Sequence, residues 1–241
     1  MRSLRYLGLS VLVSLVSLLP LSSMAADAPK TFENIYKAKL YGFKITVTNA
    51  LTKTADNHYN LLFKAESFLG SITENSTLVW NPTLQTVIPQ HYVYARRSIG
   101  KDRDAELTFN WADKSVTNNV QKTTWKMGIT QKVQDKLSYQ LQLQQDLING
   151  LDKFEYQIAD GGHLKDYGFE KVGEEVLDTP LGKVKTVKIL RSHKTDKRIT
   201  YAWLAPKWHY MLVRLQQEEK GDVYTIYINK ATLDGKAIEH F

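Results

Sequence analysis

The sequence predicts a mainly β protein: a single curved antiparallel sheet, half-barrel or barrel-like, with one main helix packed on its concave face. Apolar and polar residues alternate with period two along much of the chain, which is typical of half-buried strands. Turn signals rich in Gly, Pro, Asn and Asp separate these stretches at short, regular spacings, as in all-β sheets and barrels. One segment has helical spacing instead. The 241 residues, 43% of them hydrophobic, have an ordinary globular composition.

The first 25 residues have the form of a secretory signal. Two arginines precede an apolar run from Leu7 to Leu19, which Pro20 ends, and small residues provide a cleavage site near Ala25. The run is about 13 residues long, shorter than the ~20 that a membrane-spanning helix needs. We therefore expect export of the chain and removal of residues 1–25. Residues 26–241 would then form a single β-rich periplasmic domain, soluble after cleavage and not an integral membrane protein.

Charge and cysteine content exclude several classes of function. The formal net charge is +7, but the basic residues are spread along the chain, as on a solvated surface. An exported protein meets neither chromosome nor ATP, so we expect no nucleic-acid partner. The sequence has no cysteine, which excludes disulfides, thiolate zinc sites, iron–sulfur clusters and thiol catalysis. We expect no cofactor.

The alternation defines strands along the whole exported part. It is clearest over residues 105–111, while Ile199, Tyr201 and Trp203 share one face of another strand. In chain order, the predicted strands cover 35–41, 44–48, 58–68, 72–80, 91–99, 105–111, 115–121, 154–159, 164–173, 184–193, 199–203, 211–218 and 223–228. Turn signals between them include Asn81-Pro82, Asp113-Lys114, Gly161-Gly162 and Gly221-Asp222. No Pro/Gly/Ser-rich linker divides the chain, which favours one domain.

Residues 135–149 interrupt the strand pattern with a predicted helix. Its apolar stripe consists of Leu137, Leu141, Gln144 and Ile148. Asp135 is placed to cap the first amides, and Gly150 to end the helix with a positive φ. The alternation of Tyr139 and Leu143 is a competing strand signal, but the Gln-rich run favours a helix. A lone amphipathic helix must bury its stripe, and in an otherwise all-β chain the concave face of the sheet is the available surface.

The sequence contains no catalytic motif. The six histidines have no metal-ligand spacing, and the exported part has neither a nucleophile elbow nor a phosphate-binding loop. Paired carboxylates for glycoside cleavage meet only in three dimensions, so they stay an open alternative. We expect a protein without enzymatic activity and without a metal site.

Aromatic residues provide the candidate ligand site. The chain has 5 Trp and 13 Tyr, many of them alternating with polar residues. Aromatic faces stack on sugar rings or line apolar cavities. The candidate ligand-binding residues are Tyr94, Arg96, Trp111, Tyr139 and Trp203. Tyr94 and Arg96 share a strand face on which they could hold an anionic group. For Trp111 and Trp203, packing of the core beneath the helix is the alternative.

Three stretches of the sequence resemble motifs of a known family. Asp135 to Leu141 resembles a "D-x-L-S" helix start, and Thr179 to Val184 a "T-P-x-G" turn before a strand. Trp203 to Pro206, followed by Met211 to Arg214, resembles a "W-L-A-P … L-P-V-R" pair of strands. Met211-Leu212 departs from the pattern, because the family often has Leu-Pro there. With these motifs in this order, the chain resembles the exported bacterial family catalogued as domain of unknown function 3108.

The resemblance has mainly structural implications. It implies a curved antiparallel sheet, similar in outline to the half-barrels of periplasmic lipoprotein carriers. It implies structural roles for three residues: Asp135 caps a helix, Gly182 makes a turn and Pro206 ends a strand. The family has no established catalytic motif, so the resemblance assigns no catalytic residue.

These observations together favour a non-catalytic binding or carrier module. Its sheet would hold a lipid, a glycan or another apolar or amphiphilic envelope component in a cavity partly roofed by the helix. In one alternative the helix fills the hollow, and the protein is a structural or assembly partner of another envelope protein. A hydrolase of cell wall or polysaccharide is a further alternative, which needs convergent carboxylates in a cleft.

Overall fold

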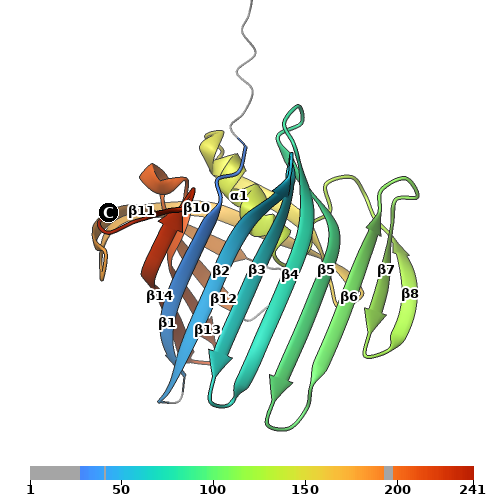
Figure 1. Cartoon of the computed structure of the whole chain (residues 1–241), viewed down its shortest axis with the longest axis horizontal. Helices are drawn as coiled ribbons and strands as arrows, with labels where there is room; N and C mark the ends of the chain where they lie inside the picture. The colour runs from blue at the N-terminus through green and yellow to red at the C-terminus, as the bar shows by residue number, and fades with distance from the viewer. Residues whose placement is uncertain (1–27, 41, 193–197) are drawn as a thin grey trace, which may run out of the picture.

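A computed structural model describes residues 28–40, 42–192 and 198–241; the proposed signal segment lies outside this part. These described residues form a β-rich structure with one α-helix, α1 (Ser138–Ile148), and one short 3₁₀ helix, η1 (Pro206–Trp208) (Figure 1). The strands are β1 (Phe32–Leu40), β2 (Phe43–Ala55), β3 (His58–Ser67), β4 (Gly70–Asn81), β5 (Thr86–Ser98), β6 (Arg103–Asn110), β7 (Ser115–Val120), β8 (Thr123–Gly128), β9 (Lys153–Asp160), β10 (His163–Thr179), β11 (Gly182–Ser192), β12 (Ile199–Ala205), β13 (Met211–Glu219), β14 (Asp222–Leu233) and β15 (Lys236–Ala237).

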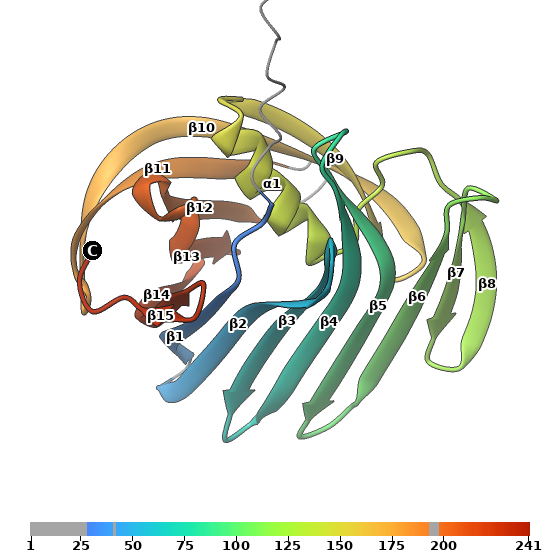
Figure 2. The ribbon, with the colours of Figure 1, turned by 45° about the horizontal axis from the view of Figure 1, so that its top comes forward.

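All of these strands belong to one antiparallel sheet. Its order is β8-β7-β6-β5-β4-β3-β2-β1-β14-β13-β12-β11-β10-β9, with β15 paired to β14. The two halves of the chain meet in the middle of the sheet, where Phe32 of β1 pairs with Leu233 of β14. The sheet curls around α1, which lies in its hollow (Figure 2). The predicted fold class is therefore confirmed, and β8 and β15 are the strands that the sequence pattern missed.

The alternation along β6 explains the orientation of its side chains. Ala105, Leu107 and Phe109 are buried, whereas the intervening residues are exposed or half-buried. Successive side chains of a strand point to opposite faces, so the apolar set packs inward. The predicted turn at Gly182 is present with a φ of +97°, and Pro206 opens η1 directly after β12, which ends that strand as expected.

The helix is shorter than predicted and is buried on more than one side. It begins at Ser138, and the Asp135 carboxylate accepts hydrogen bonds from the Leu137 and Ser138 amides at 2.7 and 2.8 Å. After Ile148 the chain leaves the helix through Gly150, with a φ of +80°. The predicted stripe is partly wrong, because Ile148 is 43% exposed. The buried residues of the helix are Ser138, Leu141, Gln142, Leu143, Gln145 and Leu147. They face both halves of the curled sheet.

Side-chain amides join the helix region to both halves of the sheet. The backbone of Gln134 pairs with β9: its N–H donates to Gln157 O at 2.9 Å, and its carbonyl accepts from Ala159 N–H at 2.8 Å. The side chain of Gln134 donates to the carbonyl of Val87 in β5 at 2.9 Å. The N–H of Val87 donates to Gln142 Oε1 of α1 at 2.7 Å. The two glutamines thus satisfy the backbone of Val87 as a neighbouring strand would.

A second contact brings the two ends of the sheet together. The ring of Trp125 in β8 lies against Gly162 in the β9–β10 turn, where an added Cβ would lie 1.8 Å from a ring carbon. Gly161 and Gly162 both have positive φ, at +58° and +87°. Glycine adopts such angles without steric cost, and here it also admits the indole.

Gly162→Ala is expected to destabilise the protein more than Gly161→Ala, by ~1–3 kcal/mol. Both variants place a Cβ at positive φ in the same turn, so the backbone cost is similar. At Gly161 the nearest atom to the new Cβ is a flexible Arg103 nitrogen at 3.4 Å, whereas at Gly162 it is the Trp125 ring. Denaturant unfolding of the two variants measures the difference. Equal losses would contradict the tight packing of Trp125 on this turn.

Candidate functional site

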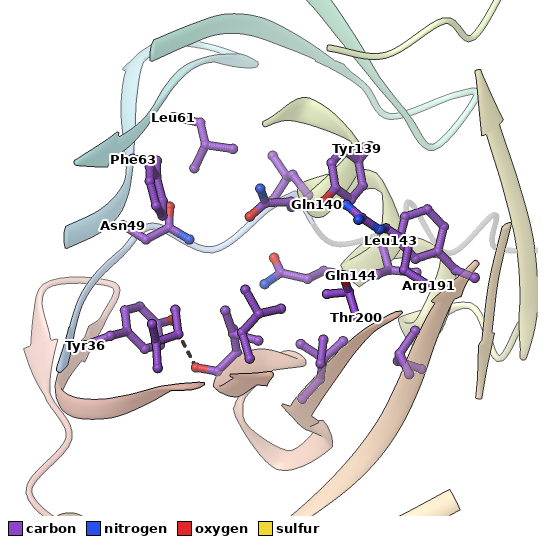
Figure 3. A pocket seen from close by; sticks show the side chains of 18 of the residues that line it. Tyr36, Asn49, Leu61, Phe63, Tyr139, Gln140, Leu143, Gln144, Arg191 and Thr200 are labelled. Atoms are coloured by element: carbon purple, nitrogen blue, oxygen red, sulfur yellow. Dashed lines mark hydrogen bonds between the residues drawn. The ribbon is translucent and has the colours of Figure 1, made fainter. Parts of the chain in front are cut away.

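The inside of the curled sheet contains a cavity of about 130 Å³ beneath α1. It lies between α1, the inner faces of β1, β2 and β3 on one side, and those of β10 to β14 on the other (Figure 3). Its apolar lining residues are Phe32, Tyr36, Val47, Leu61, Phe63, Tyr139, Leu141, Leu143, Phe169, Ile189, Ala202, Leu204, Leu212, Leu215 and Ile226. The volume is close to the ~150 Å³ of an apolar cavity that holds benzene, and below the ~300 Å³ of a pocket for a drug-sized ligand.

Polar side chains interrupt this apolar wall. They are Asn49, Gln140, Gln144, Arg191 and Thr200. Gln140 and Gln144 extend from α1 toward the cavity (Figure 3). Their Nε2 groups donate to the carbonyls of Lys136 and Tyr210, at 3.2 and 3.3 Å. These two amides are therefore anchored to the main chain on either side of the helix.

Asn49 and Thr200 differ from the two glutamines, because they carry buried atoms without a partner. Both residues are more than nine-tenths buried. Asn49 Oδ1 and Thr200 Oγ1 form no hydrogen bond within the described part of the chain. An unpaired buried polar atom costs ~1–3 kcal/mol, and such atoms are few in folded proteins. These two lie on different strands, β2 and β12, and line the same cavity.

Arg191 is the charged residue of the lining, and the Tyr139 phenol is hydrogen-bonded to it. Burial raises the pKa of Tyr139, and the nearby Arg191 guanidinium, to which the phenol is hydrogen-bonded, acts on this pKa in the opposite direction. The guanidinium also lies over the Tyr167 ring, 4.9 Å from its centroid. Arg191 pairs with Thr200 across β11 and β12, one residue before β11 ends at Ser192. Because Tyr139 belongs to α1, this polar part of the cavity lies where β11 and β12 face the helix.

Of the five sequence-predicted ligand residues, Tyr139 lines this cavity and Trp203 does not. Thr200, Ala202 and Leu204 are the β12 residues that line it. Tyr201 and Trp203 take the opposite face of the strand, as alternation requires. Trp203 is buried there, with its indole N–H donating to a Glu175 carboxylate oxygen at 2.6 Å.

The aromatic face of β12 is thus covered on the side away from the cavity. The Arg214 guanidinium lies 3.5 Å from the centroid of the Trp203 ring, and Lys188 lies over the same ring at 5.0 Å. A cation over an indole face stabilises the pair and shields the ring from water. This packing explains why the aromatic face of β12, with Tyr201 and Trp203, is not the face that lines the cavity.

Trp111 is also a packing residue. It stacks on Phe109, with ring centroids 5.7 Å apart, and its indole N–H donates to Pro89 O at 2.8 Å. Its ring lies against the core cluster that includes Leu107 and Val116. The alternative of core packing, rather than ligand lining, therefore describes both Trp111 and Trp203.

Tyr94 and Arg96 lie on β5, away from the cavity beneath α1. Tyr94 lines a separate polar pocket of about 320 Å³ between β5, β6 and the β9–β10 turn. Lys136 lies over its ring at 4.9 Å and 3.6 Å from a Glu74 carboxylate oxygen. Arg96 does not line that pocket; it donates to Lys101 O at 3.3 Å. The structure therefore does not bring Tyr94 and Arg96 together in one pocket.

The sequence pattern holds a weak signal for the polar residues that it missed. Asn49 lies between Val47 and Leu51 on the inward face of β2, where a polar residue breaks the apolar set. Such a break marks an inward-facing polar group, but it does not name the partner strand. Within the described ranges, no three His, Asp or Glu side chains gather as metal ligands. No helix of this part is long and apolar enough to cross a bilayer.

Comparison with known proteins identifies the family. A family model described as "Protein of unknown function (DUF3108)" matches residues 36–229. Among solved structures, the chain is similar to a crystal structure of a β-barrel-like protein of the domain of unknown function DUF1849 from Brucella abortus, with a TM-score of 0.60 and 9% identity. That match covers 86% of this chain and 99% of the other. No curated protein matches significantly. The family match spans most of the chain, including all three motifs quoted above, and the chain therefore belongs to the DUF3108 family of proteins of unknown function.

Proposed function

We propose that this protein is a non-catalytic binding module, which takes the apolar part of an amphiphilic envelope component into the cavity beneath α1. The observation that carries the proposal is the pair of unpaired atoms, Asn49 Oδ1 and Thr200 Oγ1, in an otherwise apolar lining. A ligand that carries hydroxyl or amide groups would supply partners for these atoms. The polar groups of the lining are amides, a hydroxyl and a guanidinium, which suit binding by hydrogen bonds.

The affinity would come mainly from the walls of the cavity. Removing apolar surface from water contributes ~25 cal/mol per Å². A cavity of about 130 Å³ takes a short apolar segment, so a longer chain would extend out of it or displace α1. The Gln142 side chain holds α1 to β5 by accepting a hydrogen bond from the Val87 N–H. Movement of the helix would therefore require this hydrogen bond to break. The helix thus serves as the roof that sets the release of ligand.

We place this activity in the periplasm on the basis of the signal-like sequence of residues 1–25. A lipid or a lipid-linked glycan is the class of envelope component that combines an apolar segment with hydroxyl or amide groups. Native mass spectrometry of the protein from the periplasm of its own host would detect such a ligand as an added mass. A clean mass with a reproducible protein partner would instead favour the assembly role.

Ala202→Phe is expected to abolish uptake of a benzene-sized apolar probe, toluene, by the delipidated protein. Ala202 lines the cavity from β12, and a phenyl ring there would occupy most of about 130 Å³. Ala50→Phe is the matched control. Ala50 follows the cavity-lining Asn49 in β2, so its side chain takes the other face of the sheet.

Calorimetric titration with toluene distinguishes the two variants. We expect saturable binding by the wild type and by Ala50→Phe, and none by Ala202→Phe. Competition by 1-octanol tests the polar pair. Thr200→Val should weaken octanol binding several-fold, because the octanol hydroxyl would lose the Thr200 hydroxyl as a hydrogen-bond partner. Equal probe binding by Ala202→Phe and the wild type would refute the cavity as the binding site.

A further inference from the structure

Four neighbouring hairpins of the sheet turn at the same end, remote from α1. They are the hairpins β13–β14, β1–β2, β3–β4 and β5–β6, and their strands are consecutive in the order of the sheet. Figure 1 shows β1 to β6 reaching the lower edge of the sheet, while α1 lies at the upper edge. We call this row of turns the rim. Neighbouring strands are ~4.8 Å apart, so four hairpins extend the rim over roughly 30 Å.

Each of the four turns carries an exposed apolar side chain. Phe68 in the β3–β4 turn is 87% exposed and Ile99 in the β5–β6 turn is 80% exposed, the two largest values for large apolar residues of the described chain. Phe43 and Val223, at the ends of the other two hairpins, are also exposed. A single exposed apolar residue is ordinary, but a row at one end of a molecule indicates an interaction surface.

The two most exposed residues belong to adjoining turns. The N–H of Ile99 donates to the carbonyl of Leu69 at 3.4 Å. A Cβ on Gly70 would lie 2.1 Å from the carbonyl oxygen of Arg97, so the two turns are packed backbone to backbone. Phe68 and Ile99 therefore belong to turns whose backbones are fixed relative to each other.

The rim also carries more exposed lysines than free acids. Three of its acids already have cationic partners: Asp102 and Asp104 pair with Arg97, and Glu219 pairs with Arg198. The exposed Asp222, at the start of β14, accepts a hydrogen bond from the Tyr224 hydroxyl at 3.2 Å. The exposed lysines of the rim that form no ion pair among the described residues are Lys39, Lys44, Lys101 and Lys220.

The opposite end of the sheet is closer to charge balance. Its lysines include Lys30, Lys53 and Lys183, which pair with Asp234, Asp56 and Asp178. Exposed lysines such as Lys114 and Lys236 also lie at this end, so what distinguishes the rim is the combination of its lysines with the row of apolar tips. The formal charge of +7 looks evenly spread in the sequence, because the rim lysines are distant from one another along the chain.

We infer that the rim docks this protein on a lipid bilayer that carries anionic phospholipid. Lysines near an anionic bilayer surface each contribute to attraction, and aromatic or aliphatic tips insert at the headgroup boundary. The inference rests on the exposure and charge of the rim and does not depend on the cavity.

Flotation with vesicles tests the inference. We expect the purified protein to float with vesicles of phosphatidylcholine containing one quarter phosphatidylglycerol, and not with phosphatidylcholine alone. The double variant Phe68→Ser/Ile99→Ser should reduce the bound fraction about tenfold or more. Leu84→Ser is the matched control, since Leu84 is 67% exposed in the β4–β5 turn at the opposite end.

A charge series provides a second, independent measurement. Lys39→Gln/Lys44→Gln should weaken binding about tenfold or more, and high salt should release the wild type. Lys114→Gln, an exposed lysine at the opposite end, should leave binding unchanged. Equal melting temperatures of all variants would show that folding is intact, and the salt titration of the wild type needs no variant at all.

Several outcomes would overturn the inference. They are no flotation with anionic vesicles, equal binding to neutral vesicles, or equal loss with Leu84→Ser. If the wild type instead forms a dimer and binds no vesicles, and Phe68→Ser/Ile99→Ser is a monomer, the rim is an interface between two copies of the chain. Ala202→Phe separates this inference from the proposed function, because the variant should lose the apolar probe and keep vesicle binding.

Discussion

Leu141→Asp is expected to cost at least ~4 kcal/mol of folding free energy, a large share of the ~5–15 kcal/mol of a typical domain. Leu141 is 3% exposed on α1 and packs into the core cluster that includes Leu61, Leu137 and Ala159. The substitution removes an apolar side chain, which alone costs ~2–5 kcal/mol, and places a carboxylate in an apolar cluster. Denaturant unfolding, or loss of folded protein on expression, measures the effect.

Ile148→Asp on the same helix is the matched control. Ile148 is 43% exposed, so the same change of chemistry should cost little, within ~1 kcal/mol. The comparison tests the burial of the helix rather than its intrinsic propensity, because both positions lie within α1. A melting temperature of Leu141→Asp equal to that of the wild type would mean that Leu141 faces water and that α1 does not lie in the hollow.

Asp135→Ala is expected to destabilise the protein by ~2–4 kcal/mol. The carboxylate is fully buried and accepts three hydrogen bonds. Two come from the Leu137 and Ser138 amides, and the third comes from the Ser76 hydroxyl of β4, at 2.6 Å. Alanine leaves the first amides of the helix region and the Ser76 hydroxyl without this acceptor. Because Ser76 is on the sheet and Ser138 on α1, the loss also detaches the start of the helix from β4.

Asp135→Asn keeps one oxygen and separates shape from charge. Burial raises the pKa of Asp135 in the folded protein above its ordinary 3.8, against the opposing effect of its hydrogen bonds. A folded-state pKa above the unfolded value means that ionisation lowers stability as pH rises through the folded pKa. The wild type should therefore gain stability relative to Asp135→Asn as the pH is lowered toward 3.8. A difference that is independent of pH, or that shrinks in acid, would contradict this assignment.

Local patterns predicted most of the strands, because a half-buried strand alternates apolar and polar residues whatever its partner strands are. Residues 105–111 and 199–203 could be placed in strands without reference to any partner, and the turn at Gly161-Gly162 marks a hairpin by itself. β8 escaped prediction because it is short and polar: over Thr123–Gly128 only Trp125 and Met127 alternate as apolar residues, and both are half-buried. The burial of Trp125 comes from Gly162, far along the chain.

The cavity could not be predicted in the same way. It is built from α1 and strands of both halves of the chain, and its unpaired atoms come from Asn49 and Thr200. Which face of β12 lines it depends on Glu175 and Arg214, which cover Trp203 on the other side. Pattern alone favoured the aromatic face, since it is the more apolar of the two. Only the curl of the sheet decides which face is concave.

The closure of the sheet has a mechanical consequence. Where β5 meets the helix region the link is made by two glutamine side chains on Val87, and where β8 meets the β9–β10 turn it is an indole resting on glycine. A continuous ladder of backbone hydrogen bonds at these two places would fix the diameter of the curled sheet. Because side chains make the links instead, changes of their rotamers would let the curled sheet widen while every strand pairing stays intact. If the protein binds a ligand as proposed, the wall would expand along this seam to take a larger molecule, without any unfolding.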